Sequence, residues 1–367
     1  MVSSLWSTVS RYIMMRFLAS IAGVYAICAV MVFLIDLVEF LRRAGDKDDV
    51  GFFPLVLMAL YRVPNFTEQA LPFAILLGSM AAFLSLSRRN ELVITRAAGL
   101  SVWQFTLPGL MVAFLIGLGA ATLYNPISAL LLEEEARLEI DHLGKSETSL
   151  LGRNGSGAWL RQEGVDGQSV IFAASARERG LVLDNVTVFV FNASGSFVER
   201  VQAKTANLKD SYWELLDAWV VAPEAQPQHY ASYLISTYLS RGQIQESFSK
   251  PENVSFWELP GFIELAERAG LSAQDYRVQY QLLLALPFLL CAMVIIAATV
   301  SLRSFRFGGV GRMVLAGVGA GFLFYVISQL VRDLGNAGIL SPPVAAWMPV
   351  IIVTLAGLTV LLYQEDG

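Results

Sequence analysis

The chain has 367 residues, of which 55% are hydrophobic and only 16% charged, with a formal net charge of -5 and a mean hydropathy of +0.55. Soluble domains carry about 25% charged residues, so this composition excludes an ordinary soluble protein and indicates an integral membrane protein. The net charge says little, because charges in such chains collect in loops, and no nucleic-acid partner is expected.

Six hydrophobic stretches are divided three and three by a polar insert at 133–260. A helix needs about 20 apolar residues to cross the hydrocarbon core of a bilayer, so each stretch is long enough, or nearly so, to be a membrane span. The stretches are residues 17–41, 70–87, 105–125, 281–301, 313–331 and 345–363.

Arginines predict the orientation, because cytoplasmic loops carry an excess of basic residues. They lie in the N-terminal segment and in the loops after the second and fourth spans, which places these loops and both termini in the cytoplasm. The insert is then external, which means the periplasm if the cell is Gram-negative. The arginines are Arg11, Arg16, Arg88, Arg89, Arg96, Arg303, Arg306 and Arg312.

The insert is expected to be a β domain. Short runs of β-branched and aromatic residues alternate with glycine-containing turns, which favours a sandwich or jelly roll. Its aromatic residues either fill an ordinary core or line an open interior that holds a lipid chain. The expected strands are 158–161, 169–174, 186–191, 197–201, 212–216, 219–221 and 230–238, with a helix following at 259–269.

The insert contains no cysteine, because Cys28 and Cys291 both lie in apolar stretches. This excludes a disulfide framework or a cysteine-based metal site there. No metal and no cofactor are expected anywhere in the chain.

The polar segment 87–104 between the second and third spans has a helical pattern. At 100° per residue, Arg88, Glu91 and Thr95 share one face, whereas Leu92 belongs to the broad apolar arc opposite. This pattern is typical of an interfacial amphipathic helix that lies on the membrane. It is equally typical of a helix that docks into the groove of a cytoplasmic partner, with Glu91 as the charged contact.

No catalytic or nucleotide-binding motif is present. The segment Gly144-Lys145-Ser146 resembles the end of a P-loop, but the position of its required first glycine is Glu139. The chain is therefore not expected to be an enzyme. If it transports a substrate, ATP hydrolysis belongs to another polypeptide.

Four segments resemble the lipopolysaccharide export permeases of the LptF/LptG family, and the likeness extends over nearly the whole chain. They are 88-RRNELVITRAAGLS-101, 262-FIELAERAGLSAQDYRVQYQ-281, 301-SLRSFRFGGVGR-312, and 321-GFLFYVISQL-330 followed by 342-PP-343. The segment 321–330 favours the LptG type.

The resemblance implies an α-helical membrane protein of six transmembrane helices with an inserted periplasmic all-β jellyroll-like domain. Its parts are residues 1–132 with spans one to three and a cytoplasmic coupling helix at 88–100, the periplasmic domain at 133–260, and a connecting helix with spans four to six at 261–367. Spans one and five are expected to line lateral gates.

The resemblance also implies a function and partners. The chain is expected to be the permease subunit of an ABC transporter that extracts lipopolysaccharide from the inner membrane and passes it to a periplasmic bridge. Its expected partners are an LptF-type paralogue, an LptB-type ATPase dimer, an LptC-type bitopic protein, lipopolysaccharide and membrane lipids. Two alternatives remain: the LptF role in the same complex, or a membrane anchor whose periplasmic domain binds a protein partner.

Two groups of site residues follow from the resemblance. Glu91 corresponds to the glutamate of the coupling helix, with Arg88, Arg89, Leu92 and Thr95 beside it. Arg42 and Arg43 match a basic pair at the outer end of span one, where guanidinium groups bind lipid phosphates; membrane anchoring is the alternative role. The chain departs from the family at Asp36, where a further basic residue is expected. This departure predicts that the ring of basic residues around the lipid phosphates is weaker. It also predicts a substrate with fewer phosphates or with acidic sugars.

Overall fold

The computed structural model divides into two compact units. Met1–Glu135, Ser255–Trp257 and Arg277–Gly367 form a helical unit, and Ala136–Val254 and Glu258–Tyr276 form a β unit. The structure describes residues 2–45, 51–89, 91, 101–143, 158–165, 167–177, 180–192, 196–223, 226–238, 251–268, 272–307 and 310–365.

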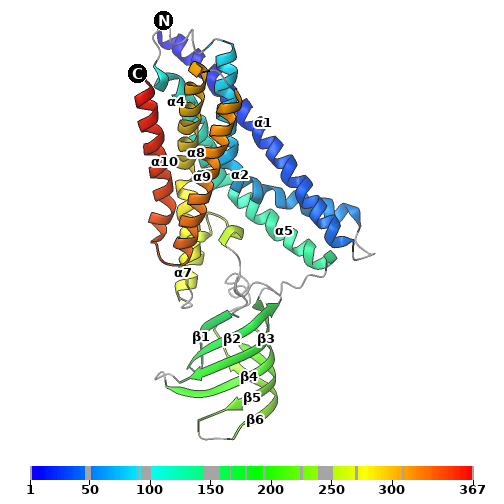
Figure 1. Ribbon diagram of the computed structural model, residues 1–367. Helices are drawn as coiled ribbons and strands as arrows, with labels where there is room; N and C mark the ends of the chain where they lie inside the picture. Colours follow the sequence, from blue (N-terminus) through cyan, green and yellow to red (C-terminus); the bar gives the residue numbers. More distant parts are fainter. Residues whose placement is uncertain are drawn as a thin grey trace. The chain divides into compact units, whose positions relative to one another are not determined.

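In the described part of the chain, six helices are long and apolar enough to cross a membrane, which confirms the six predicted spans (Figure 1). The helical segments are α1 (Val2–Ala44), α2 (Phe52–Arg88), α4 (Val102–Gly119), η1 (Ala120–Tyr124), α5 (Asn125–Leu143), α7 (Leu259–Arg268), α8 (Gln274–Phe307), α9 (Val310–Asn336) and α10 (Pro342–Glu365), with a short 3-10 turn, η3 (Pro251–Asn253).

Helix α2 is much longer than the hydrophobic stretch 70–87 that marks it in the sequence. It begins at Phe52 and continues through Pro64. Polar residues such as Glu68 and Gln69 lower the local hydropathy without ending the helix. The third span also continues past its apolar stretch, through the π-helical turn η1 and on to Leu143.

The N-terminal half of α1 is anchored by close packing. A Cβ atom added at Gly78 of α2 would lie 2.6 Å from the Cα atom of Ile21, and one added at Gly109 of α4 would lie 2.6 Å from the Phe17 ring. Phe17 is fully buried and its ring makes an edge contact with Phe83, with centroids 5.0 Å apart. Small residues at helix contacts allow such approach inside a membrane.

The β unit confirms the predicted all-β insert. Its six strands form one antiparallel sheet in the order β1 to β6, so each strand pairs with its neighbours in the sequence (Figure 1). The strands are β1 (Ala158–Gly164), β2 (Gly167–Arg177), β3 (Val182–Phe191), β4 (Phe197–Leu208), β5 (Tyr212–Val221) and β6 (Gln228–Ser236).

The two segments predicted at 212–216 and 219–221 are one strand, β5, with a change of backbone direction at Asp217. Asp217 has φ of 56°, and Asn185 of β3 has φ of 50°. Asn and Asp tolerate this left-handed conformation better than most residues. Neither residue has a paired Cα partner, yet the register is the same on both sides of each. The two positions therefore bend long strands without a slip of pairing, and the sheet curves (Figure 1).

Gln162 of β1 joins the first strand to the far side of the curved sheet. Its amide nitrogen donates to Ser169 Oγ at 2.9 Å. Its amide oxygen accepts from Trp213 Nε1 at 2.9 Å and from Thr237 Oγ1 at 2.7 Å. Trp213 is fully buried in the apolar face of the sheet, whereas Trp219 is half exposed. Among the aromatic residues of the insert, Trp213 is therefore a core residue, whereas Trp219 is not.

Candidate functional site

The basic pair predicted at the end of α1 is organised by one carboxylate. The Arg42 guanidinium donates to Glu39 through Nε at 3.1 Å and through a terminal nitrogen at 2.9–3.1 Å. Arg43 Nε donates to the same carboxylate at 2.7 Å. The spacings of three and four residues place all three side chains on one face of the helix. Because the Arg42 side chain is 76% exposed, its ion pair contributes little stability and can exchange with another anion.

A third arginine lies at the same end of the hairpin, on α2, and the sequence analysis did not single it out. The Arg62 guanidinium lies 5.7 Å from the centre of the Phe40 ring and 5.1 Å from that of Phe66. Arg43 also lies over Phe40, at 6.0 Å. The signal in the sequence was a lone arginine within 55-LVLMALYRVP-64, a segment that the hydropathy pattern left outside the spans.

Asp36, the residue that departs from the family pattern, is buried on α1, three residues before Glu39 and four before Phe40. Only 8% of it is exposed, and its Oδ2 atom has no hydrogen-bond partner within the described structure. Its spacing from Glu39 and Phe40 places it on the face of α1 that carries the cluster. The end of the α1–α2 hairpin is therefore a mixed-charge cluster, with three guanidinium groups and two carboxylates.

The predicted coupling segment is described only in part. Arg88 and Arg89 are exposed at the end of α2, and Glu91 is half-buried. Leu92 and Thr95 lie outside the described residues. The structure adds a contact that the sequence did not reveal: Tyr12 of α1 donates a hydrogen bond to Glu91 Oε1 at 3.1 Å. Arg16 Nε in turn donates to the Tyr12 hydroxyl at 3.0 Å.

A second polar contact joins α1 to α2 and η1 in mid-span. The Tyr25 hydroxyl donates to Thr67 Oγ1 at 3.0 Å and lies 2.6 Å from the Tyr124 hydroxyl. Tyr124 belongs to the π-helical turn η1, a type of irregularity that is frequent at functional sites. Three helical segments thus share one small cluster of hydroxyl groups.

The same turn also receives the segment Ser255–Trp257. Asn125 Nδ2 donates to Glu68 Oε1 at 3.0 Å, and Asn125 Oδ1 accepts from the backbone N–H of Phe256 at 2.9 Å. Trp257 Nε1 donates to the carbonyl oxygen of Thr122 at 3.0 Å. The Asn125 side chain therefore provides a hydrogen-bond donor to a carboxylate and an acceptor to a backbone amide.

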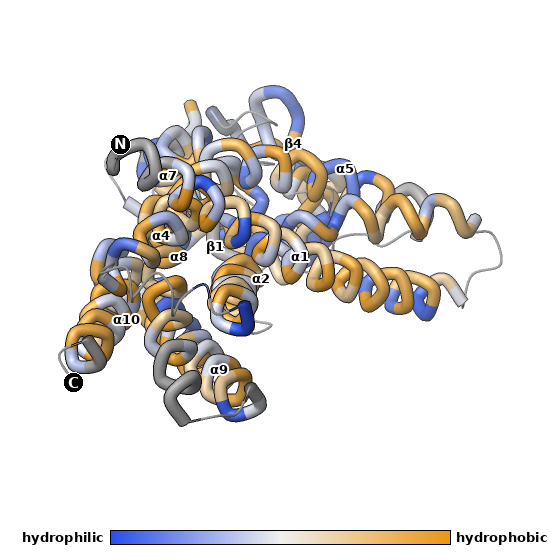
Figure 2. The backbone as a smooth tube through the Cα atoms, turned by 90° about the horizontal axis from the view of Figure 1, so that it is seen from above, coloured by the Kyte–Doolittle hydropathy of each residue, from blue (hydrophilic) through white to orange (hydrophobic). Residues whose placement is uncertain are grey.

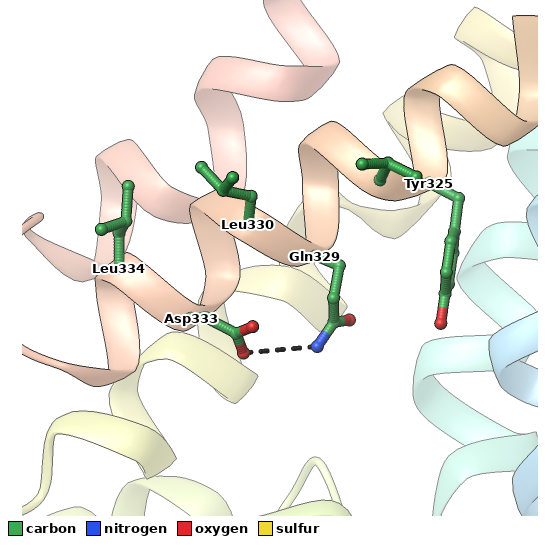
Figure 3. A pocket seen from close by; sticks show the side chains of 6 residues that line it. Tyr325, Gln329, Leu330, Asp333 and Leu334 are labelled. Atoms are coloured by element: carbon green, nitrogen blue, oxygen red, sulfur yellow. Dashed lines mark hydrogen bonds between the residues drawn. The ribbon is translucent and has the colours of Figure 1, made fainter.

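Helix α9 carries an open groove of about 430 Å³ on one side (Figure 3). Tyr325, Gln329 and Asp333 recur every four residues, and Gln329 Nε2 donates to Asp333 Oδ1 at 3.3 Å. The remaining lining residues, Val326, Leu330 and Leu334, are apolar. The arrangement suits an amphipathic ligand, because a polar stripe runs beside an apolar one.

Among the residues that the structure describes, no group of three or more His, Cys, Asp or Glu side chains is arranged to hold a metal ion. The chemistry available is that of charged and hydroxyl groups at the ends and centre of apolar helices.

Comparison with known proteins identifies the family. A family profile described as "Lipopolysaccharide export system permease LptF/LptG" matches residues 11–363. The chain is 21% identical over 338 residues to the lipopolysaccharide export system permease protein LptG of Haemophilus influenzae, covering 89% of this chain and 90% of that protein. It is 22% identical over 349 residues to the protein of the same name from Escherichia coli K12, covering 90% and 91%. The chain belongs to the LptF/LptG family of lipopolysaccharide export permeases, and it is a multi-pass membrane protein of that family.

Proposed function

We propose that this chain is the LptG-type half of a lipopolysaccharide exporter. In this role it pairs with an LptF-type paralogue, binds an LptB-type ATPase dimer and an LptC-type bitopic protein, and passes lipopolysaccharide from the inner membrane to a periplasmic bridge. The termini are cytoplasmic and the β unit is periplasmic. The relatives carry the LptG name, which supports LptG over LptF.

The unequal burial of the six spans carries this proposal. In the most apolar stretch of α1 only 6% of the residues are buried, and in that of α9 22%, against 56% in α2 and 61% in α8. Hydrophobic residues run along much of α1 and α9 (Figure 2). Family resemblance assigns lateral gates to spans one and five, which are α1 and α9. Two helices with so little burial within the chain leave apolar faces open to a paralogue or to lipid, which is what a lateral gate requires.

The end of α1 is the proposed site for the lipid head group. Arg42 and Arg43 bind phosphate when it displaces Glu39, because a phosphate dianion offers more acceptor oxygens and more charge than one carboxylate. Glu39 holds the two guanidinium groups side by side in the absence of lipid. A long apolar helix that ends in this cluster matches a molecule with several acyl chains and a phosphorylated head.

The other end of α1 is the proposed coupling site. The segment 88–100 docks on the ATPase, with Glu91 as the charged contact and with Arg88, Arg89, Leu92 and Thr95 completing the contact surface. Because Glu91 also accepts a hydrogen bond from Tyr12, a displacement of the docking segment acts directly on the base of α1.

Co-purification tests the proposal. The tagged chain is expressed with its genomic neighbours, and the proteins that accompany it are identified before and after Glu91→Lys. We expect recovery of an ATPase and a six-span paralogue, with the ATPase lost or uncoupled from export in the variant. Glu258→Lys, at an exposed glutamate in the β unit, is the matched charge reversal and should change neither. Recovery of the chain alone, or only with periplasmic proteins, would instead indicate a membrane anchor.

A further inference from the structure

Arg62 differs from the other two arginines of its cluster in what holds it. Arg42 and Arg43 both donate hydrogen bonds to Glu39. Arg62 is held by aromatic rings, with Phe40 at 5.7 Å and Phe66 at 5.1 Å. Cation–π contacts with ring faces fix the plane of a guanidinium without using its N–H donors, which point outward in that plane. Arg62 is therefore oriented and still has donors to offer.

Asp36 is a buried carboxylate one helical turn from the contact between Phe40 and Arg62. It is 92% buried, so its charged form requires nearby positive charge. Asp36 lies one helical turn before Phe40, whose ring the Arg62 guanidinium contacts at 5.7 Å. No hydrogen bond or ion pair joins Asp36 to Arg62 within the described residues. A carboxylate at this position attracts the guanidinium and leaves its donors unoccupied.

Position 36 is also where the family resemblance leads one to expect a basic residue. The helices α1 and α2 form an antiparallel hairpin (Figure 1). Asp36 is eight residues before the end of α1 at Ala44, and Arg62 is ten residues after the start of α2 at Phe52. The two residues therefore lie at a similar level of the hairpin. The positive charge is thus present at the same end of the hairpin but on the neighbouring helix.

We infer that Arg62 is the third phosphate ligand of the head-group site, and that Asp36 is its positioning residue. The ligand is a phosphate group carried by a lipid head. Arg62 binds it through free N–H donors while Phe40 and Phe66 fix the guanidinium plane. This inference rests on the proposed head-group role of Arg42 and Arg43. From the sequence, Asp36 is expected to reduce the positive charge of the head-group site. In this inference Arg62 supplies the positive charge that position 36 lacks.

The test compares binding of two probes by the purified complex of the chain and its co-expressed partners. One probe is bis-phosphorylated lipid A and the other is the same lipid after enzymatic removal of both phosphates. Arg62→Gln should weaken binding of the phosphorylated lipid about tenfold, the loss expected for charge-assisted hydrogen bonds, and should leave the dephosphorylated lipid unchanged. Inorganic phosphate serves as competitor: displacement assigns the site to phosphate in general, and lack of displacement assigns it to lipid-borne phosphate.

A rescue variant separates a charge effect from misfolding. In the double variant Asp36→Lys/Arg62→Gln, the positive charge returns to α1 and the buried carboxylate is gone, so binding of the phosphorylated lipid should recover. Lys204→Gln, which removes an exposed charge from β4, is the matched control and should bind both lipids normally.

Three outcomes overturn different claims. If Arg62→Gln binds the phosphorylated lipid as well as the unaltered protein while the variant Arg42→Gln/Arg43→Gln does not, Arg62 is not a phosphate ligand and the head-group site stands without it. If neither Arg62→Gln nor Arg42→Gln/Arg43→Gln weakens binding of the phosphorylated lipid, the proposed head-group site itself is wrong. Failure of Asp36→Lys to rescue a folded Arg62→Gln protein would remove the inferred exchange of charge between the helices.

Discussion

The Tyr12 hydroxyl donates a hydrogen bond to Glu91 Oε1 at 3.1 Å, although the two residues are 79 positions apart in the chain. The contact ties the base of α1 to the segment that is proposed to dock on the ATPase. Arg16 donates to the same hydroxyl and its guanidinium lies 5.3 Å from the Tyr12 ring centre. A donor bonded to a cation becomes a stronger donor itself, so the three side chains act as one unit.

Tyr12→Phe should therefore reduce coupling without preventing assembly. The variant keeps the ring and removes only the hydroxyl, so the ATPase still co-purifies while Glu91 loses its link to α1. Because a single hydrogen bond is worth about 0.5–1.5 kcal/mol, we expect lipid export per ATP hydrolysed to fall roughly two- to tenfold. The measurement is lipid release and phosphate production by the reconstituted complex.

The control for this change is Tyr363→Phe, which removes a hydroxyl from a side chain that is 84% exposed near the end of α10. It should behave as the unaltered protein. Equal export per ATP in Tyr12→Phe and Tyr363→Phe would mean that Tyr12 does not transmit the motion. The comparison also clarifies Glu91→Lys, which removes the docking contact and the acceptor for Tyr12 together.

Sequence reasoning located the elements well and the contacts between them poorly. Continuous apolar runs identify membrane spans, because a helix in the hydrocarbon core must satisfy its own backbone and present apolar side chains to lipid. Alternating apolar residues bounded by turn residues identified the strands. The first half of α2 was missed because Glu68 and other polar residues lower its hydropathy, and Arg62 was missed with it. Gln162 and Asn125 are polar residues whose importance comes from partners distant in the chain. No local pattern carries that information.

Asn125→Ala should destabilise the helical unit. Asn125 donates to Glu68, which would be left without that donor in an apolar surrounding, and it also accepts from the backbone of Phe256. Loss of a partner from a buried polar group costs about 1–3 kcal/mol, so the purified protein should unfold at a lower temperature, by several degrees. The readout is thermal unfolding followed by intrinsic fluorescence in detergent.

A second substitution, at Glu68, tests whether the lost hydrogen bond to this carboxylate causes the destabilisation. Glu68→Gln in the Asn125→Ala background removes the carboxylate that lost its donor, so it should recover part of the lost stability. Gln69→Ala, which removes an exposed hydrogen bond to Asn65 of 3.3 Å, should be nearly neutral. Additive losses in Glu68→Gln/Asn125→Ala would contradict a direct energetic link between the two side chains.

Gln162→Ala should loosen the closure of the curved sheet. The change removes the acceptor of Trp213 Nε1 and Thr237 Oγ1, both buried, and leaves a small void beside them. We expect faster amide hydrogen exchange in β1 and β6 while β3 and β4, in the middle of the sheet, keep their protection. Gln202→Ala, at an exposed position of β4, should leave all strands unchanged. Uniform acceleration across the six strands would show instead that Gln162 supports the whole unit.

Two glycines of the third span offer a matched pair for testing helix packing. A Cβ atom at Gly117 would lie 2.5 Å from the Cα atom of Pro287 in α8, whereas one at Gly119 would meet nothing within 4 Å. Alanine at position 117 must push two backbones apart, which costs about 1–3 kcal/mol as overpacking does elsewhere. Alanine at position 119 should be neutral or slightly stabilising, because alanine favours the helix over glycine by about 1 kcal/mol. The prediction is a lower unfolding temperature for Gly117→Ala alone. Equal unfolding temperatures for the two variants would mean that α4 and α8 do not pack closely at Gly117 and Pro287.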